Sequence, residues 1–185
     1  MKAPILAALL CSSHLALAGD FQLSSPDIPS NGSIPQTFEF NGFGCTGQNT
    51  SPALNWVNPP AETRSFAVTV YDPDAPTGSG WWHWSVINLP AGTRSLPANA
   101  GALGDHNLPK GASQIRIDYG VAAWGGVCPP VGDKAHRYIF KVHALKVPSL
   151  SLPADATAAL AGYMINANTL ATASFTAHYG RDRQR

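Results

Sequence analysis

The residues of this chain best suited to chemistry begin with two aspartates separated by a single proline. The run Asp72-Pro73-Asp74-Ala75-Pro76 follows an apolar stretch, so it predicts a turn at the end of a strand. Because proline fixes φ, the Asp72 and Asp74 carboxylates would be held in position before any ligand binds. The alternative is a purely structural turn in which both carboxylates accept hydrogen bonds from backbone amides.

A histidine within a tryptophan-rich run lies a few residues further along, in Trp81-Trp82-His83-Trp84. Alternation along a strand predicts that Trp82 and Trp84 share one face and that His83 lies on the other, toward Asp72. A lone histidine in such a run is more often structural. Beside two aspartates the imidazole favours a binding site, since Asp72 could accept its hydrogen bond and fix its tautomer.

The third group combines a glycine–proline loop with a histidine and a tyrosine. Gly125-Gly126-Val127-Cys128-Pro129-Pro130 predicts a loop whose backbone amides can approach a ligand closely. His136 and Tyr138 lie two residues apart at the start of a predicted strand, so both project from one side. An imidazole and a phenol would donate hydrogen bonds to an anion. The alternative is a turn into a hairpin, with Tyr138 in the core.

The first eighteen residues predict a signal peptide rather than part of the fold. Lys2 is followed by the apolar run Ile5–Leu10 and by Ala16-Leu17-Ala18, which fits cleavage near Ala18 and a periplasmic or secreted protein. The remaining residues, 19–185, predict a single domain. Without Lys2 the 12 basic residues become equal in number to the 11 acidic ones, a balance that argues against nucleic acid as a partner. No later run is apolar enough for an integral membrane segment.

Cleavage would also remove Cys11 and leave two cysteines, Cys45 and Cys128. Two cysteines in an exported protein most often form one disulfide, so the sequence predicts a Cys45–Cys128 bridge. A pair of buried free thiols is the alternative.

The chain holds 17 glycines and 16 prolines, which indicates many turns. Together with several stretches of alternating apolar residues, these turns predict a β-rich domain. One helix is predicted from Pro153 through Ala167, with Tyr163 and Met164 toward the core. Three long polar loops are predicted at Asn41–Pro52, Pro97–Gly111 and Gly120–Lys134. Loops of this length in one compact domain are uncommon unless they have a function. The predicted strands are Phe66–Tyr71, Trp82–Leu89 and Arg137–Val147, with shorter ones at Phe21–Ser24, Thr37–Phe40, Leu54–Val57, Gln114–Tyr119 and Thr172–Tyr179.

Taken together with the run Gly47–Trp56, these motifs resemble the phosphatidylethanolamine-binding protein family, in particular its bacterial Raf-kinase-inhibitor-like branch, which includes exported members. The resemblance spans about Phe21 to Tyr179. It implies a mainly β protein with antiparallel sheets in a Greek-key-like fold and a few short helices. It also implies a small pocket for phosphate-like anions or phospholipid head groups, lined by Asp72, Asp74, Pro76, Trp81, His83, Pro129, His136 and Tyr138.

Some positions depart from the family pattern. Cys128 stands where many relatives have glycine, so a disulfide to Cys45 would brace the pocket rim. The segment Arg116–Gly120 replaces an Asn-Asp pair that is usual in the bacterial branch, and the long C-terminal helical segment of animal relatives is missing. A homodimer would fit the bacterial branch.

In the implied pocket, Asp72 would orient an imidazole that donates to the anion, while Asp74 would accept from an ammonium group. Three other functions remain open. An enzyme is disfavoured because Gly-x-Ser-x-Gly and His-Glu-x-x-His are absent. A metal site is disfavoured because the carboxylates and histidines lack a recognised ligand spacing, so neither a metal nor another cofactor is predicted. An inhibitor of a kinase or other signalling protein, acting independently of the pocket, is the third.

Overall fold

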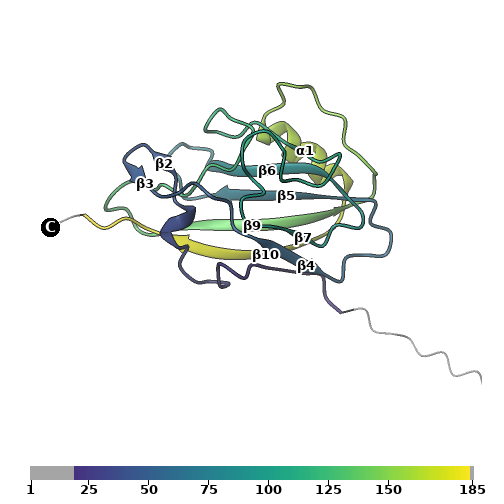
Figure 1. Ribbon diagram of the computed structural model, residues 1–185, viewed down its shortest axis with the longest axis horizontal. Helices are drawn as coiled ribbons and strands as arrows, with labels where there is room; N and C mark the ends of the chain where they lie inside the picture. Colours follow the sequence, from purple (N-terminus) through teal and green to yellow (C-terminus); the bar gives the residue numbers. More distant parts are fainter. Residues whose placement is uncertain (1–18, 184–185) are drawn as a thin grey trace, which may run out of the picture.

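A five-stranded antiparallel sheet forms the centre of the computed structural model, which describes residues 19–183 (Figure 1). Its strand order is β10-β9-β5-β6-β8, and it is accompanied by a three-stranded sheet β1-β4-β7 and a hairpin β2-β3. The strands are β1 Gln22–Ser24, β2 Asn41–Gly42, β3 Cys45–Thr46, β4 Leu54–Val57, β5 Ser65–Asp72, β6 Trp81–Pro90, β7 Ser95–Leu96, β8 Ser113–Gln114, β9 His136–Leu145 and β10 Thr169–Tyr179; the helices are a 3-10 turn at Gln36–Phe38 and α1 at Ala158–Asn168.

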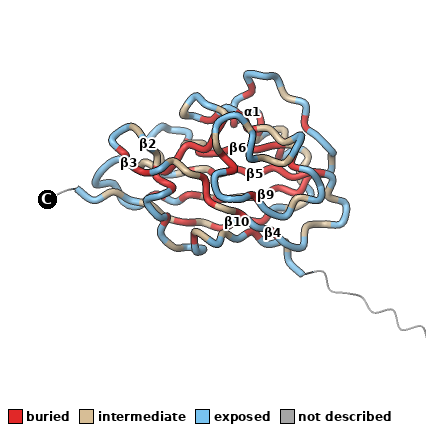
Figure 2. The backbone as a smooth tube through the Cα atoms, viewed as in Figure 1, coloured by how far each residue is buried: buried red, intermediate tan, exposed pale blue. Residues whose placement is uncertain are grey.

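Both faces of the large sheet are covered, so its central strands are buried almost throughout (Figure 2). On one face the main core packs between the large sheet and the three-stranded sheet, with Trp56 against Phe66. On the other face a smaller core packs beneath α1, with Ala67 and Ile165 among its members. This two-sided burial explains the continuous apolar sequence of β5. The predicted mainly β, antiparallel fold class is confirmed.

The predicted long strands are confirmed, but two of the short ones are wrong. Residues 37–40 lie at a 3-10 turn, in which the Phe38 amide donates to the Pro35 carbonyl. The strand predicted over Gln114–Tyr119 ends at Gln114, and the chain then turns back at Gly120, whose φ is +82°. In both places the chain makes an isolated β-bridge, Glu39 with Val127 and Arg116 with Thr157, rather than a continuous strand.

The helix starts later than predicted and buries a different face. Thr157 caps it by accepting a hydrogen bond from the Leu160 amide, so Pro153 lies before the helix. Tyr163 is 71% exposed, and the prediction that it faces the core is wrong. Ala158, Ala161 and Ile165 are the buried residues of α1 and face the sheet instead. Within residues 19–183, no helix is long and apolar enough to cross a bilayer.

A β-bulge corrects the predicted orientation of the tryptophans. Val70 pairs with Trp84 but the next residue, Tyr71, pairs with Trp82, so β6 carries one extra residue at His83. Trp84 therefore packs against Trp124 in the main core, whereas Trp82 packs against Tyr71, with the two rings tilted, on the opposite face near α1. A bulge of this kind redirects side chains. Here it places His83 on the same side of the sheet as Trp84.

A buried histidine beneath α1 predicts acid sensitivity. Burial is the main cause that lowers the pKa of His143 to about 4, with Lys141 adding to it. The unfolded chain binds this proton below about pH 6.5 while the folded chain does not, so stability is complete above that pH and falls between 6.5 and 4. The loss should reach about 3 kcal/mol. Urea unfolding of His143→Gln across this range should show a flatter pH dependence, and His106→Gln on an exposed loop should match the wild type.

Candidate ligand-binding site

A cavity of about 180 Å³ lies at one end of the large sheet. Antiparallel pairing brings the last residue of β5, Asp72, next to the beginnings of β6 and β9. Trp81 and His136 open those two strands, so residues far apart in sequence meet at the left end of the sheet in Figure 1. This volume is below the roughly 300–1,000 Å³ typical of drug-sized ligands and suits a small group.

Seven of the eight predicted site residues line this cavity, and Asp74 does not. The seven are Asp72, Pro76, Trp81, His83, Pro129, His136 and Tyr138, and they are joined by Phe43, Ala75, Thr77, Tyr119, Cys128 and Pro130.

Asp72 and His136 form a buried pair at the base of the cavity. His136 Nδ1 donates to Asp72 Oδ2 at 2.8 Å, which fixes the tautomer of the ring. Asp72 Oδ1 accepts the backbone amides of Asp74 and Ala75 at 2.8 and 3.1 Å. The aspartate thus combines both predicted roles, since it caps the turn and orients an imidazole.

His83 has a different partner from the one that its position near Asp72 suggested. Its Nδ1 lies 2.7 Å from the Gly125 carbonyl oxygen. A carbonyl only accepts, so Nδ1 carries the hydrogen and Nε2 is left with a lone pair. Burial lowers the pKa of His83, against the opposing influence of the Gly125 carbonyl and Asp72. His83 is therefore a neutral imidazole at pH 7.

Two buried donors among the cavity residues have no hydrogen-bond partner within residues 19–183. They are the Tyr138 hydroxyl and the Trp81 indole N–H. The pKa of Tyr138 is strongly raised, mainly by burial and then by Asp72, so the phenol keeps its proton. Buried polar groups without partners are unusual because each is costly to desolvate. Both donors belong to residues that line the cavity.

Asp74 turns away from the cavity toward Arg137. The guanidinium donates to both carboxylate oxygens at 2.9 and 2.7 Å, and the Arg137 amide adds a third hydrogen bond. This pairing lowers the pKa of Asp74 to about 2. The carboxylate is engaged, which removes the predicted role as acceptor for a ligand ammonium group.

The glycine loop supports the site through its carbonyl groups rather than its amides. The amides of Gly125, Gly126 and Val127 donate within the protein, to the His83 carbonyl, to Asn49 Oδ1 and to the Phe38 carbonyl. The prediction that these amides face a ligand is therefore wrong. A side chain at Gly126 would lie 2.4 Å from the Phe40 backbone nitrogen, so glycine allows the close approach that forms this wall.

Tyr119 and Phe43 are wall residues that the sequence reading missed. Tyr119 lies edge-on to Trp81 and His83 at 5.3 and 5.7 Å, and its hydroxyl donates to the Gly126 carbonyl at 2.9 Å. The departure noted at Arg116–Gly120 was the one signal for Tyr119. Nothing in the local pattern of Phe43 distinguishes it from an ordinary loop residue.

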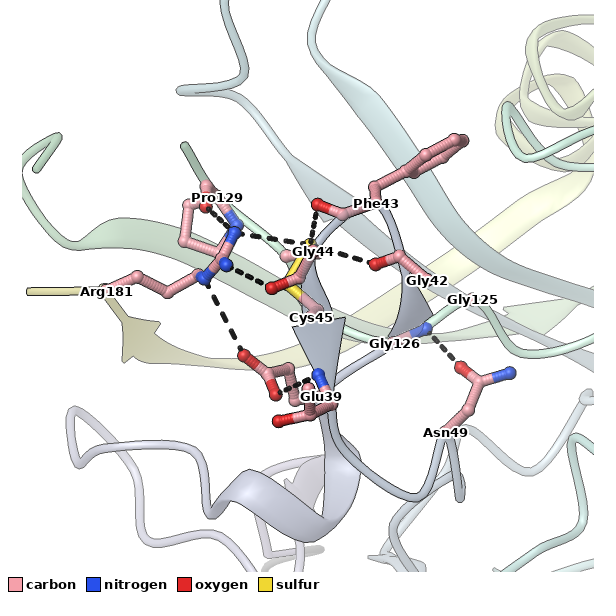
Figure 3. Close-up of a disulfide and its surroundings, with 12 residues drawn as sticks. Glu39, Gly42, Phe43, Gly44, Cys45, Asn49, Gly125, Gly126, Pro129 and Arg181 are labelled. Atoms are coloured by element: carbon pink, nitrogen blue, oxygen red, sulfur yellow. Dashed lines mark hydrogen bonds and ion pairs between the residues drawn. A yellow bond between two sulfur atoms is a disulfide. The ribbon is translucent and has the colours of Figure 1, made fainter. Parts of the chain in front are cut away.

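The disulfide predicted between Cys45 and Cys128 is confirmed, with its Cα atoms 6.0 Å apart (Figure 3). Cys128 lines the cavity, so the bridge ties the cavity wall to the β2–β3 hairpin. Arg181 adds to this connection by donating to the Pro129 and Gly44 carbonyls, while its Nε lies 3.8 Å from the buried Glu39.

Among residues 19–183, no group of three or more histidine, cysteine, aspartate or glutamate side chains is arranged to hold a metal ion.

The fold and site define a β-sheet binding protein with a small preformed cavity, and comparisons identify its family. A family model described as phosphatidylethanolamine-binding protein matches residues 24–180. The UPF0098 protein YbcL of Escherichia coli K12 is 52% identical over 164 residues, 89% of this chain and 90% of YbcL. The UPF0098 protein YbhB of the same organism is 47% identical over 158 residues, 85% of this chain and 99% of YbhB.

Solved structures agree with this relationship. The crystal structure of E. coli YbcL, described as a member of the mammalian PEBP family, matches with a TM-score of 0.86 at 52% identity over 88% of this chain and 99% of that one. The PEBP homologue CT736 of Chlamydia trachomatis matches with a TM-score of 0.72 at 28% identity, over 88% and 98%. The chain belongs to the phosphatidylethanolamine-binding protein family.

Proposed function

We propose that this protein binds a small phosphate-bearing ligand or head group in the cavity at the sheet end. The observation that carries the proposal is the pair of buried, unpartnered donors, Tyr138 Oη and Trp81 Nε1, in one small cavity. These neutral donors can form hydrogen bonds to an anionic oxygen, so the site does not depend on a cationic side chain. His136 adds a further imidazole, which Asp72 holds in a fixed orientation.

The neighbouring charges decide how strong such binding is. Asp72 repels an anion, but its two oxygens are engaged by His136 and two backbone amides. Arg137 is paired with Asp74 and does not line the cavity. The ligand is therefore held by short-range hydrogen bonds rather than by a strong positive field, and we expect weak, size-selective binding.

The test is a titration with inorganic phosphate and phosphoethanolamine, followed by NMR of the backbone amides. Chemical-shift changes should concentrate at the ends of β5, β6 and β9 and in the loop 125–130. If saturating phosphate leaves these resonances unmoved and shifts only exposed lysines and arginines, the cavity is not an anion site.

Tyr138→Phe should separate binding from stability. Removing the hydroxyl deletes one donor to the ligand, worth about 10-fold or more in phosphate affinity for a hydrogen bond to a charged group. It also removes a buried polar group that has no protein partner, so the free energy of unfolding should rise by about 1 kcal/mol. Calorimetric titration and urea unfolding measure the two effects. Tyr163→Phe, at an exposed position on α1, should change neither.

We further propose that the protein binds its ligand without transforming it. The side chains of the cavity that could attack a phosphate are engaged elsewhere, since Cys128 is in the disulfide, the Thr77 hydroxyl donates to the Gly80 carbonyl and Asp72 is bonded at both oxygens. Incubation with phosphoethanolamine, followed by phosphorus NMR, should show no release of inorganic phosphate. Release that disappears in His136→Ala would establish an enzyme instead.

Export to the periplasm or outside the cell, after cleavage near Ala18, is also part of the proposal. The predicted signal peptide lies in residues 1–18, outside the described part of the chain, and the disulfide supports an oxidising compartment. Fractionation with amino-terminal sequencing tests it, and a full-length chain in the cytosol would contradict it. We also propose that the protein forms a homodimer. A monomeric mass measured by light scattering would contradict this.

A further inference from the structure

Phe43, at the mouth of the cavity, combines high exposure with an unfavourable backbone conformation. It occupies the turn between β2 and β3 with φ at +52°, a region that bulky residues rarely adopt. Its side chain is 78% exposed, so packing in the core does not explain the conformation. Backbone strain of this kind is concentrated at functional sites, where the surrounding structure holds it in place.

The surroundings hold this turn firmly. Two residues along the chain, Cys45 is bonded to Cys128 in the cavity wall, and Arg181 donates to the intervening Gly44 carbonyl (Figure 3). The turn is thus linked to the opposite wall by a covalent bond and by an arginine from the C-terminal segment. Phe43 extends away from these links in Figure 3 rather than covering them.

The Phe43 ring continues an aromatic wall that reaches into the cavity. It lies nearly parallel to the Tyr119 ring, at 5.9 Å and 16°, and 5.6 Å from the Phe40 ring. Tyr119 in turn contacts Trp81 and His83 edge-on. The cavity is therefore polar and buried at its base, where Asp72 and His136 lie, and aromatic at its mouth.

Resting on the anion site proposed above, we propose that Phe43 makes the site selective for phosphate monoesters that carry a flat aromatic group. The phosphate oxygens meet the buried donors at the base, and the organic group lies against the exposed face of Phe43. A flat ring matches this face because Phe43 and Tyr119 are already nearly parallel, and stacked aromatic pairs add affinity beyond simple burial.

Three probes test the selectivity: inorganic phosphate, phenyl phosphate, and cyclohexyl phosphate, which is of similar size but not flat. Titration calorimetry of the wild type should show phenyl phosphate binding about 3- to 10-fold more tightly than either of the other two. In Phe43→Ala this preference, taken as the ratio of the affinities for phenyl phosphate and inorganic phosphate in the same variant, should fall to within about twofold.

Phe43→Gly provides a second variant that removes the ring and suits the positive φ, so it keeps the turn folded. It should lose the preference in the same way, whereas Tyr163→Ala, which removes an exposed aromatic from α1, should retain it. A preference that persists in both Phe43 variants, or one that extends equally to cyclohexyl phosphate, overturns the inference.

The proposed function and this inference fail in different ways. If the wild type binds inorganic phosphate but shows no preference for phenyl phosphate, the role of Phe43 is wrong and the anion site stands. If none of the three probes shifts the backbone amide resonances of the cavity residues, the anion site and the role of Phe43 are both wrong.

Discussion

Replacing Asp72 by alanine should lower the free energy of unfolding by about 3–5 kcal/mol, a large effect for a single side chain. The loss arises because Asp72 is buried and accepts three hydrogen bonds, from His136 Nδ1 and from the amides of Asp74 and Ala75. Its removal leaves an imidazole and two amides without their partner. Chemical denaturation at pH 7 measures the change.

Asp74 provides the matched control, since it lies two residues away in the same turn. Its carboxylate pairs with Arg137, whose side chain is 55% exposed, so solvent screens the pair. Asp74→Ala should therefore cost no more than about 1 kcal/mol. Equal losses in the two variants would show that the buried pair has no special role. Asp72→Ala should also weaken phosphate binding, because His136 loses its fixed orientation.

Removing the disulfide in the double variant Cys45→Ala, Cys128→Ala should lower the stability by about 2–5 kcal/mol. The bridge joins residues 83 apart in sequence, and closing so long a loop restricts the unfolded chain strongly. For a chain of this size the melting temperature should fall by about 5–15 °C. Thermal unfolding followed by circular dichroism measures the shift.

Reductant supplies the control for that experiment. Dithiothreitol should lower the melting temperature of the wild type by a similar amount and should leave the double variant unchanged. A wild type insensitive to complete reduction would contradict the stabilising role of the bridge. Because the bridge also positions the β2–β3 turn, the double variant should lose the preference for phenyl phosphate proposed for Phe43.

Local sequence patterns predicted the main strands because alternation and turn residues act within a few residues of one another. The strand at Arg137–Val147 places Tyr138, Phe140 and Val142 on one face, where they join the main core. The turn chemistry of Asp72-Pro73-Asp74 marked where β5 ends. Only two cysteines remain once the predicted leader is removed, so composition was enough to pair Cys45 with Cys128.

The sequence predictions were wrong where contacts between distant segments override the local pattern of apolar residues. The opposite orientations of Trp82 and Trp84 follow from a bulge, and a bulge is a property of the register between β5 and β6. Similarly, the face of α1 that is buried depends on how closely the helix can approach the sheet. Helical periodicity predicted that Tyr163 faces the core, yet the folded helix buries Ala158, Ala161 and Ile165 and leaves Tyr163 exposed.

The sequence by itself determined which residue types gather at the strand ends, the β-rich class and the family to which the chain belongs. Tertiary structure decided their individual roles: Asp72 pairs with His136, Asp74 with Arg137, and His83 with the Gly125 carbonyl. The physical reason is that a side chain's type and its place on a strand are local properties. Its hydrogen-bond partner, burial and pKa depend on groups that only the folded chain brings within a few ångströms.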